Sequence, residues 1–111
     1  MSVPADCVFC AIVDGKFGTT FVHEDATCVA FADLKPMAPT HLLVVPRAHH
    51  ERLSDAAGDQ ALLGHLLGVA GGLVTDRGFR VVVNNGADAG QTVYHLHLHV
   101  LAGRHFGWPP G

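Results

Sequence analysis

The stretch His95-Leu96-His97-Leu98-His99-Val100-Leu101 alternates imidazole and aliphatic side chains up to Val100. Because side chains of a β-strand alternate between two faces, a strand over residues 94–101 would put the three imidazoles on one face, about 6.7 Å apart, and Leu96, Leu98 and Val100 in the core. A single histidine is commonly a satisfied surface group, but three buried imidazoles in register would each need a hydrogen-bond partner. The alternation therefore indicates a functional face.

Two kinds of chemistry fit three imidazoles on one strand. One is metal binding, since imidazole suits zinc, copper, iron and nickel. The sequence has no Asp or Glu after Asp88, however, so no carboxylate from the same part of the chain can complete such a site. In the other, His97 is a nucleophile and its neighbours neutralise an oxyanion, as in phosphoryl or nucleotidyl transfer. No G-x-S-x-G, P-loop or G-x-G-x-x-G motif offers a competing centre, so we favour the nucleophile.

The rest of the chain predicts one α+β domain, residues 1–111. Short β-rich or apolar runs predict strands over residues 19–23 and 27–33, which would form a hairpin, and over residues 41–45, 79–84 and 94–101. One amphipathic helix is expected, with Ser54 and Asp55 as its N-cap and first-turn acid, apolar residues up to Val74, and Gly78 as its stop. This order predicts an antiparallel sheet of about five strands with one main helix packed on it.

Three glycines interrupt the expected helix at every fourth position, Gly64, Gly68 and Gly72. Each costs about 1 kcal/mol relative to Ala in a helix interior. They indicate either a tight helix contact, such as one between subunits, or sequence drift to glycine that a well-packed helix tolerates.

The composition excludes several classes of protein. The 111 residues are 49% hydrophobic and 15% charged, which suits a folded globular domain. The net charge of −3, with no basic run, argues against polymeric nucleic acid as a partner. No stretch approaches the roughly 20 apolar residues of a membrane span, and the first ten residues lack the apolar segment of a secretory signal. We therefore expect a cytoplasmic protein.

Cys7-Val8-Phe9-Cys10 is a C-x-x-C motif, which occurs both in redox dithiols and in zinc knuckles. A thioredoxin-like role would need a βαβ context that the sequence does not supply. Zinc would need two further ligands from the histidines, such as His49 and His95. We favour structural zinc over a redox pair, with an empty site as a third option.

These residues resemble the histidine triad (HIT) superfamily, whose motif of three histidines separated by apolar residues matches His95 to Leu101. Within it, the chain is most similar to the Hint branch, over nearly its whole length. The similarity is carried by Phe31-Ala32-Asp33, Ala38-Pro39-Thr40-His41, Val83-Asn84-Asn85-Gly86, Gly90-Gln91-Thr92-Val93-Tyr94-His95 and Trp108-Pro109-Pro110-Gly111. The resemblance implies a HIT-like fold and a homodimer.

The resemblance also implies catalytic roles for individual residues. His97 would attack the α-phosphorus of a nucleotide, and His99 and Thr92 would contact the phosphate. His41 would orient the histidine cluster, and the backbone carbonyl of His95 would fix the tautomer of His97. A neutral imidazole is required of a nucleophile, and a reference pKa of about 6.5 leaves most of it neutral at pH 7.

Other residues would bind the nucleotide. They are Asp33 at the ribose hydroxyls, Leu34 against the base, Asn84 beside the phosphate, Gly90 at the end of the small-residue loop of residues 86–90, Gln91 directly after it, and Trp108, whose tail would reach the partner's pocket. Without this role, Asp33 would be a turn residue before Pro36.

Some members of the family with an amino-terminal C-x-x-C resemble zinc proteins. The implied ligands are Cys7, Cys10, His49 and His95, with His50 as an alternative to its neighbour. The resulting hypothesis is a homodimeric nucleotide phosphoramidase, or nucleotidyl hydrolase, that cleaves purine nucleoside 5′-phosphoramidates such as an AMP–amine conjugate. The alternative is a nucleotide- or zinc-binding scaffold protein with negligible turnover.

Overall fold

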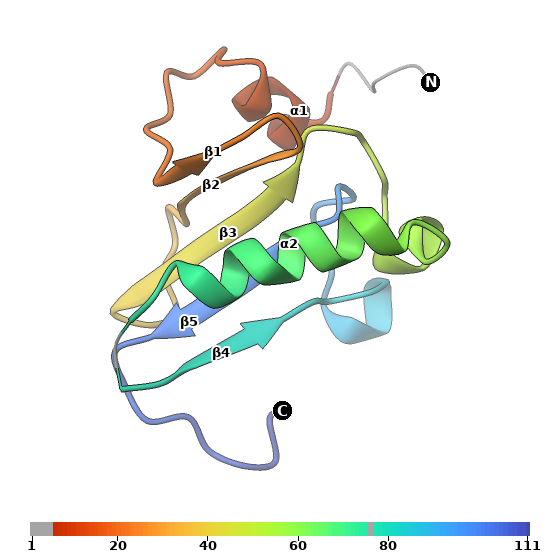
Figure 1. Ribbon diagram of the computed structural model, residues 1–111. Coiled ribbons are helices and arrows are strands. Elements are labelled where there is room, and N and C mark those ends of the chain that lie inside the picture. The colour runs from red at the N-terminus through yellow and green to blue at the C-terminus, as the bar shows by residue number, and fades with distance from the viewer. Residues whose placement is uncertain (1–5, 76) are drawn as a thin grey trace.

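The computed structural model describes residues 6–75 and 77–111, and its centre is a five-stranded antiparallel sheet (Figure 1). The spatial order is β1-β2-β3-β5-β4. The strands are β1 His23–Glu24, β2 Cys28–Ala32, β3 Thr40–Pro46, β4 Phe79–Val82 and β5 Leu98–Ala102. The helices are α1 Val8–Val13 and α2 Gln60–Gly72, with two short 3-10 turns, η1 Leu53–Ala56 and η2 Ala87–Ala89. The predicted α+β class and antiparallel sheet are confirmed.

Each face of the sheet packs against a different helix. Figure 1 shows α2 running along one face of β3 and β5. The core on that face joins residues of α2 to Leu96, which precedes β5, and to alternate residues of the strands, among them Cys28, Ala30, Val44, Leu98 and Val100. The opposite face carries a smaller core in which Phe9 of α1 packs with Val29, Phe31, Leu43 and Val45. The prediction that Leu96, Leu98 and Val100 enter the core is confirmed.

The main helix is shorter at both ends than the sequence predicts. Ser54 and Asp55 lie in η1, and α2 begins only after Asp59, whose side chain accepts a hydrogen bond from the backbone N–H of Leu62. An aspartate is an equally good N-cap, and the sequence offers two candidates within a few residues. The helix ends at Gly72, because two consecutive glycines disfavour further helix well before Gly78.

The strand that carries the histidines also begins later than predicted. Its ladder starts at Leu98, which pairs with Val44, so His95 and His97 precede the strand. The backbone N–H of Leu96 donates to the carbonyl of His50, 2.7 Å away, and not to a strand of the sheet. Similarly, β1 has two residues where residues 19–23 were expected, although the hairpin with β2 is present. In the described parts of the chain, no helix is long and apolar enough to cross a membrane.

Candidate active site and metal cluster

A cavity of about 490 Å³ opens on the α1 face, between that helix and the ends of β2 and β5. Six of the residues predicted to act in catalysis or nucleotide binding line it, namely Asp33, Leu34, His41, Thr92, His97 and His99. Apolar side chains make up much of the remaining wall, including Val8, Phe9, Ile12, Phe31 and Leu43. Both the size and the mixture of an apolar wall with a few polar groups are typical of small-molecule sites.

Backbone and side-chain hydrogen bonds set the tautomers of His41 and His99. The N–H of Met37 donates to Nδ1 of His41 at 3.0 Å, so the proton of that ring is on Nε2. His41 Nε2 lies 2.8 Å from Nδ1 of His99 and therefore donates to it. His99 in turn carries its own proton on Nε2, and this N–H is left as a hydrogen-bond donor.

His97 has the opposite tautomer. Its Nδ1 lies 2.7 Å from the backbone carbonyl oxygen of His95, an acceptor, so Nδ1 carries the proton and Nε2 carries the lone pair. Burial lowers the pKa of His97 below its usual value and lowers that of His99 to about 4. Both rings are therefore neutral at pH 7. Their centroids are 4.9 Å apart, which places a nucleophilic nitrogen beside a hydrogen-bond donor.

The fold supplies a carboxylate that the local sequence lacks. Asp33, at the end of β2, has its Oδ2 3.4 Å from Nε2 of His41, and its Oδ1 accepts the backbone N–H of Lys35 at 2.9 Å. A carboxylate therefore lies beside the triad histidines although the sequence has no Asp or Glu after Asp88. Leu34, beside Asp33, is almost fully exposed at the cavity edge.

Four residues expected at the nucleotide do not line this cavity: Asn84, Gly90, Gln91 and Trp108. Gln91 is buried, and its amide holds the loop together. Its Oε1 accepts the N–H of Gly86, and its Nε2 donates to the carbonyls of Glu51 and Val93.

Trp108 is 83% exposed, in a tail that is fastened beside β4. Arg80 of β4 donates to the carbonyl of Gly107 at 2.8 Å, and Arg80 and Arg104 both lie over the ring of Phe106. Within this chain the tail therefore stays away from the triad.

The four predicted metal ligands come together in one cluster. Their donor atoms, Cys7 Sγ, Cys10 Sγ, His49 Nδ1 and His95 Nδ1, lie within 4.8 Å of one another. The closest pairs are the two imidazole nitrogens at 3.1 Å and three sulfur–nitrogen pairs at 3.3 to 3.4 Å. These are near the edges of about 3.3–3.6 Å that tetrahedral zinc bond lengths would give. The donor set therefore fits zinc, and the histidine that lies in the cluster is His49 and not His50.

The orientation of His95 supports the same interpretation. Its Nε2 lies 2.8 Å from the carbonyl oxygen of Pro46 and donates to it, so Nδ1 turns its lone pair toward the cysteines. Burial lowers the pKa of His95 to about 4 and raises that of the Cys10 thiol to about 12. A neutral imidazole ligand is therefore ready, whereas the thiol would need a bound cation to ionise.

The helix α1, which connects this cluster to the cavity, was not predicted from the sequence. Cys7 is its N-cap, with its sulfur accepting the N–H of Cys10. Between the two cysteines, the Phe9 ring packs edge-to-face on His97, with centroids 5.0 Å apart, and on His95 at 6.0 Å. The apolar residues at positions 8, 9, 12 and 13 were the available signal for a helix, but six residues are too few to show a clear period.

A family model described as the HIT domain matches residues 15–106. The chain belongs to the HIT domain family. An uncharacterized HIT-like protein from Synechocystis sp. is 49% identical to this HIT-domain chain over 111 residues, covering 96% of this chain and 97% of its own.

Solved structures of the same family have the same fold. A HIT family hydrolase from Legionella pneumophila superposes with a TM-score of 0.87 at 42% identity, covering 96% of this chain and all of the other. A histidine triad nucleotide-binding protein from Candida albicans gives a TM-score of 0.77 at 30% identity, covering 94% of this chain and 83% of its own. The predicted HIT-like fold is therefore confirmed.

Proposed function

We propose that this HIT-domain protein is a nucleotidyl hydrolase of the Hint branch that cleaves purine nucleoside 5′-phosphoramidates through a covalent nucleotidyl-histidine. One observation carries the proposal: the unprotonated Nε2 of His97, with its tautomer fixed by the His95 carbonyl, belongs to a ring that lines the cavity next to His99. A buried, neutral imidazole beside a donor is what attack on phosphorus requires. The words hydrolase and nucleotide-binding in the names of two similar structures support the same class.

The reaction would proceed in two balanced steps. In the first, the Nε2 lone pair of His97 forms a bond to the α-phosphorus, and the P–N bond breaks. The leaving nitrogen keeps that electron pair and takes up a proton from water, while Nδ1–H of the modified ring continues to donate to the His95 carbonyl. In the second, water attacks phosphorus and loses a proton, which neutralises the hydroxide left by the first step; the electron pair of the P–Nε2 bond returns to the ring, and a nucleoside monophosphate is released.

The neighbouring side chains would bind the phosphate and the nucleoside. His99 Nε2–H and Thr92 would donate to phosphate oxygens, where negative charge builds up in the transition state. Asp33 keeps acceptor capacity beyond its bond to Lys35 and would accept the ribose hydroxyls. Leu34 and Phe31, which line the cavity, would pack on the base. Asn84, Gly90 and Gln91 do not line it and would act only by supporting the loop around the phosphate.

The metal cluster would hold a structural zinc ion through Cys7, Cys10, His49 and His95. Zinc would link α1 to the segment before β5, with no part in bond breaking. The side chain of His95 would bind the metal, while its backbone carbonyl accepts the hydrogen bond from Nδ1 of His97.

A homodimer is also part of the proposal. It rests on the resemblance to the Hint branch, on β4 as an edge strand, and on the exposed Trp108 in the tail beside that strand. In a dimer this tryptophan would reach the partner's cavity. Light scattering measures the mass in solution directly. A monomer at assay concentration would contradict the proposed homodimer.

Hydrolysis of a fluorogenic AMP amide tests the function. Wild type, His97→Ala and a chelator-treated sample are compared, and acid-labile adducts are sought by mass spectrometry after a rapid quench. We expect turnover and an adduct in wild type, and neither in His97→Ala. Equal background rates in all three samples would instead favour the second candidate, a nucleotide- or zinc-binding scaffold, which the geometry of the metal cluster also suits.

A further inference from the structure

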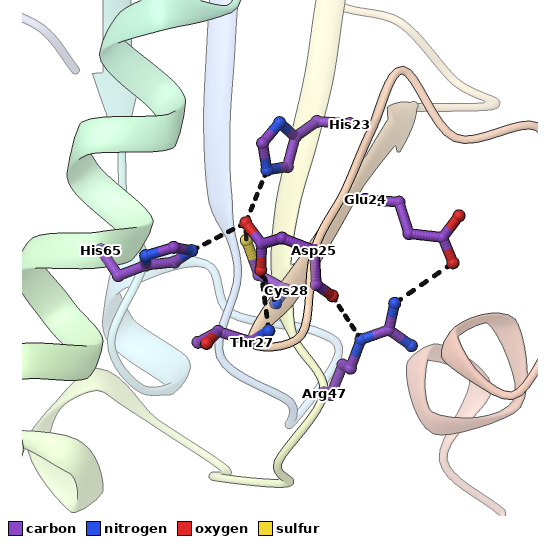
Figure 2. Close-up of polar contacts among 7 residues, drawn as sticks. All are labelled: His23, Glu24, Asp25, Thr27, Cys28, Arg47 and His65. Atoms are coloured by element: carbon purple, nitrogen blue, oxygen red, sulfur yellow. Dashed lines mark hydrogen bonds and ion pairs between the residues drawn. The ribbon is translucent and has the colours of Figure 1, made fainter.

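A second cluster of metal-binding side chains lies on the α2 face, separate from the triad. Figure 2 shows it: His23 of β1 and His65 of α2 approach the same carboxylate, that of Asp25, from two different elements. His23 Nε2 is 2.6 Å and His65 Nε2 is 2.8 Å from Oδ2 of Asp25. The buried thiol of Cys28 lies 3.6 Å from the same oxygen. We call these four residues the Asp25 cluster.

The backbone holds the Asp25 carboxylate in a fixed orientation. Its other oxygen, Oδ1, accepts the N–H groups of Thr27 at 2.7 Å and Cys28 at 2.8 Å (Figure 2). Arg47 bonds to the backbone carbonyl of Asp25 and to the side chain of Glu24. Oδ1 is therefore occupied by the turn, and Oδ2 is the oxygen directed at the histidines.

The site is open on one side. A groove of about 440 Å³ runs beside His23 and His65, along Gly64, Gly68 and Gly72 of α2. A Cβ built on any of these glycines meets no atom within 4 Å, so a tight contact within the chain is not their explanation. The small residues instead leave a path by which a hydrated ion can reach the two half-exposed imidazoles.

We propose that His23 Nε2, Asp25 Oδ2 and Cys28 Sγ, which all lie within 4.8 Å of one another, form a second metal site for a divalent first-row transition ion of the zinc type. His65 Nε2, 2.8 Å from Asp25 Oδ2, is the fourth donor and completes the site from α2. Two imidazoles with one carboxylate are a ligand set that zinc accepts, whereas calcium and magnesium prefer oxygen.

In the present structure the two imidazoles are hydrogen-bonded to Asp25 Oδ2, at 2.6 and 2.8 Å. Ligand atoms that share a zinc ion are about 3.0–3.5 Å apart, so each ring would move away from Asp25 Oδ2 by a few tenths of an ångström. His65, which lies outside the set of mutually close donors, would also move toward His23. A metal-bound Nε2 carries no proton, so each imidazole would bind the ion with its proton on Nδ1. An ion bound here would bridge the β1–β2 hairpin and α2, on the opposite side of the sheet from the reaction cavity.

The test is a difference in metal stoichiometry between wild type and variants. Both are dialysed to equilibrium against zinc, and bound metal is measured by elemental analysis. We compare wild type with His65→Gln and with the double variant His23→Gln/His65→Gln. His105→Gln is the matched control, because His105 is exposed in the tail and belongs to none of the clusters in the described residues.

We expect wild type and His105→Gln to bind one more equivalent than the double variant. Apparent zinc affinity at this site should fall in His65→Gln by at least the 10–100-fold typical of losing an outer-shell partner. Because only the difference is used, loading of the Cys7 cluster and AMP-amide hydrolysis do not affect the result. Equal stoichiometry in wild type and a folded double variant, checked by circular dichroism, would overturn the proposal.

A spectroscopic measurement identifies the ligands directly. In imidazole ¹H–¹⁵N spectra, added zinc should shift the Nε2 resonances of His23 and His65 and leave His105 unchanged. If both resonances stay in place while zinc binds elsewhere, the Asp25 cluster is only a hydrogen-bonded link.

Discussion

Replacing His41 by leucine tests the chain of tautomers directly. His41 is 6% exposed and makes two hydrogen bonds, from the N–H of Met37 at 3.0 Å and to Nδ1 of His99 at 2.8 Å. Leucine has neither a donor nor an acceptor, so both partners lose their bond. Without the donor at Nδ1, the His99 ring is free to carry its proton there, and the Nε2–H aimed at the phosphate is lost.

The expected magnitude follows from two separate costs. Two groups left unsatisfied cost about 1–3 kcal/mol each if they stay dry, which lowers the free energy of unfolding. Loss of one preorganised donor to the transition state costs about 2.7–4 kcal/mol, or 10²–10³-fold in kcat. Steady-state hydrolysis of the fluorogenic AMP amide gives kcat and KM, with urea denaturation for stability and His105→Gln as control.

The substitution also distinguishes a role of His41 in orienting His99 from a role in binding the substrate. Because His41 is expected to act through His99, kcat should fall much more than KM rises, and the acid-labile adduct should form slowly but still on His97. His41→Gln, which retains a donor and an acceptor, should recover part of the rate. A folded His41→Leu protein with kcat within threefold of wild type would refute the tautomer argument.

Four further outcomes are expected. Since the pKa of His99 and that of His95 are both about 4 in the folded chain and near 6.5 when unfolded, the free energy of unfolding of the metal-free protein should fall as pH drops from 6.5 toward 4, with each of the two histidines contributing up to about 1.4 kcal/mol per unit; a flat urea-midpoint series would contradict this. Gly103→Ala should lower the melting temperature by several degrees, because φ is +94° and the new Cβ would lie 2.7 Å from Cβ of Pro39, whereas Gly107→Ala should not. Chelation should reduce kcat, and zinc should restore it, because the metal cluster holds α1 against the triad; unchanged kcat in metal-free protein would count against this. Deleting residues 108–111 should change the preference between purine and pyrimidine amides more than it changes stability, and an unaltered preference would show that Trp108 does not reach a pocket.

Much of the fold was predictable because its signals are local. The alternation through His99 and Val100 identified the buried aliphatic residues of β5, and the apolar run at residues 41–45 identified β3 at the centre of the sheet. The ends of elements were less predictable. Whether Ser54 or Asp59 caps the helix depends on tertiary contacts, such as the hydrogen bond from the N–H of Ser54 to Asn85. Nothing near Ser54 in the sequence encodes that partner.

The candidate site was only partly predictable, for the same reason. Resemblance named the four residues whose donor atoms the structure brings together, but spacing alone left the third and fourth ligands open. The carboxylate of Asp33 and the ring of Phe9 come from distant segments, and only the folded sheet brings them to the triad. The Asp25 cluster was also missed, because His65 lies on an exposed part of α2 and 40 residues separate it from Asp25.

The segment before β5 explains why the triad histidines cannot be interchanged, although the sequence presents them as a repeat. His95 turns its side chain to the cysteines and its carbonyl to His97, whereas His99, inside the ladder, receives its hydrogen bond from His41 on the next strand. A strand that ran regularly from residue 94 would have used the His95 carbonyl differently. The late start of β5 therefore lets His95 contribute its side chain to the metal cluster and its carbonyl to the nucleophile. The three identical side chains adopt two tautomers, because the partners of His95 and His99 place the proton on Nε2, whereas the His95 carbonyl places that of His97 on Nδ1.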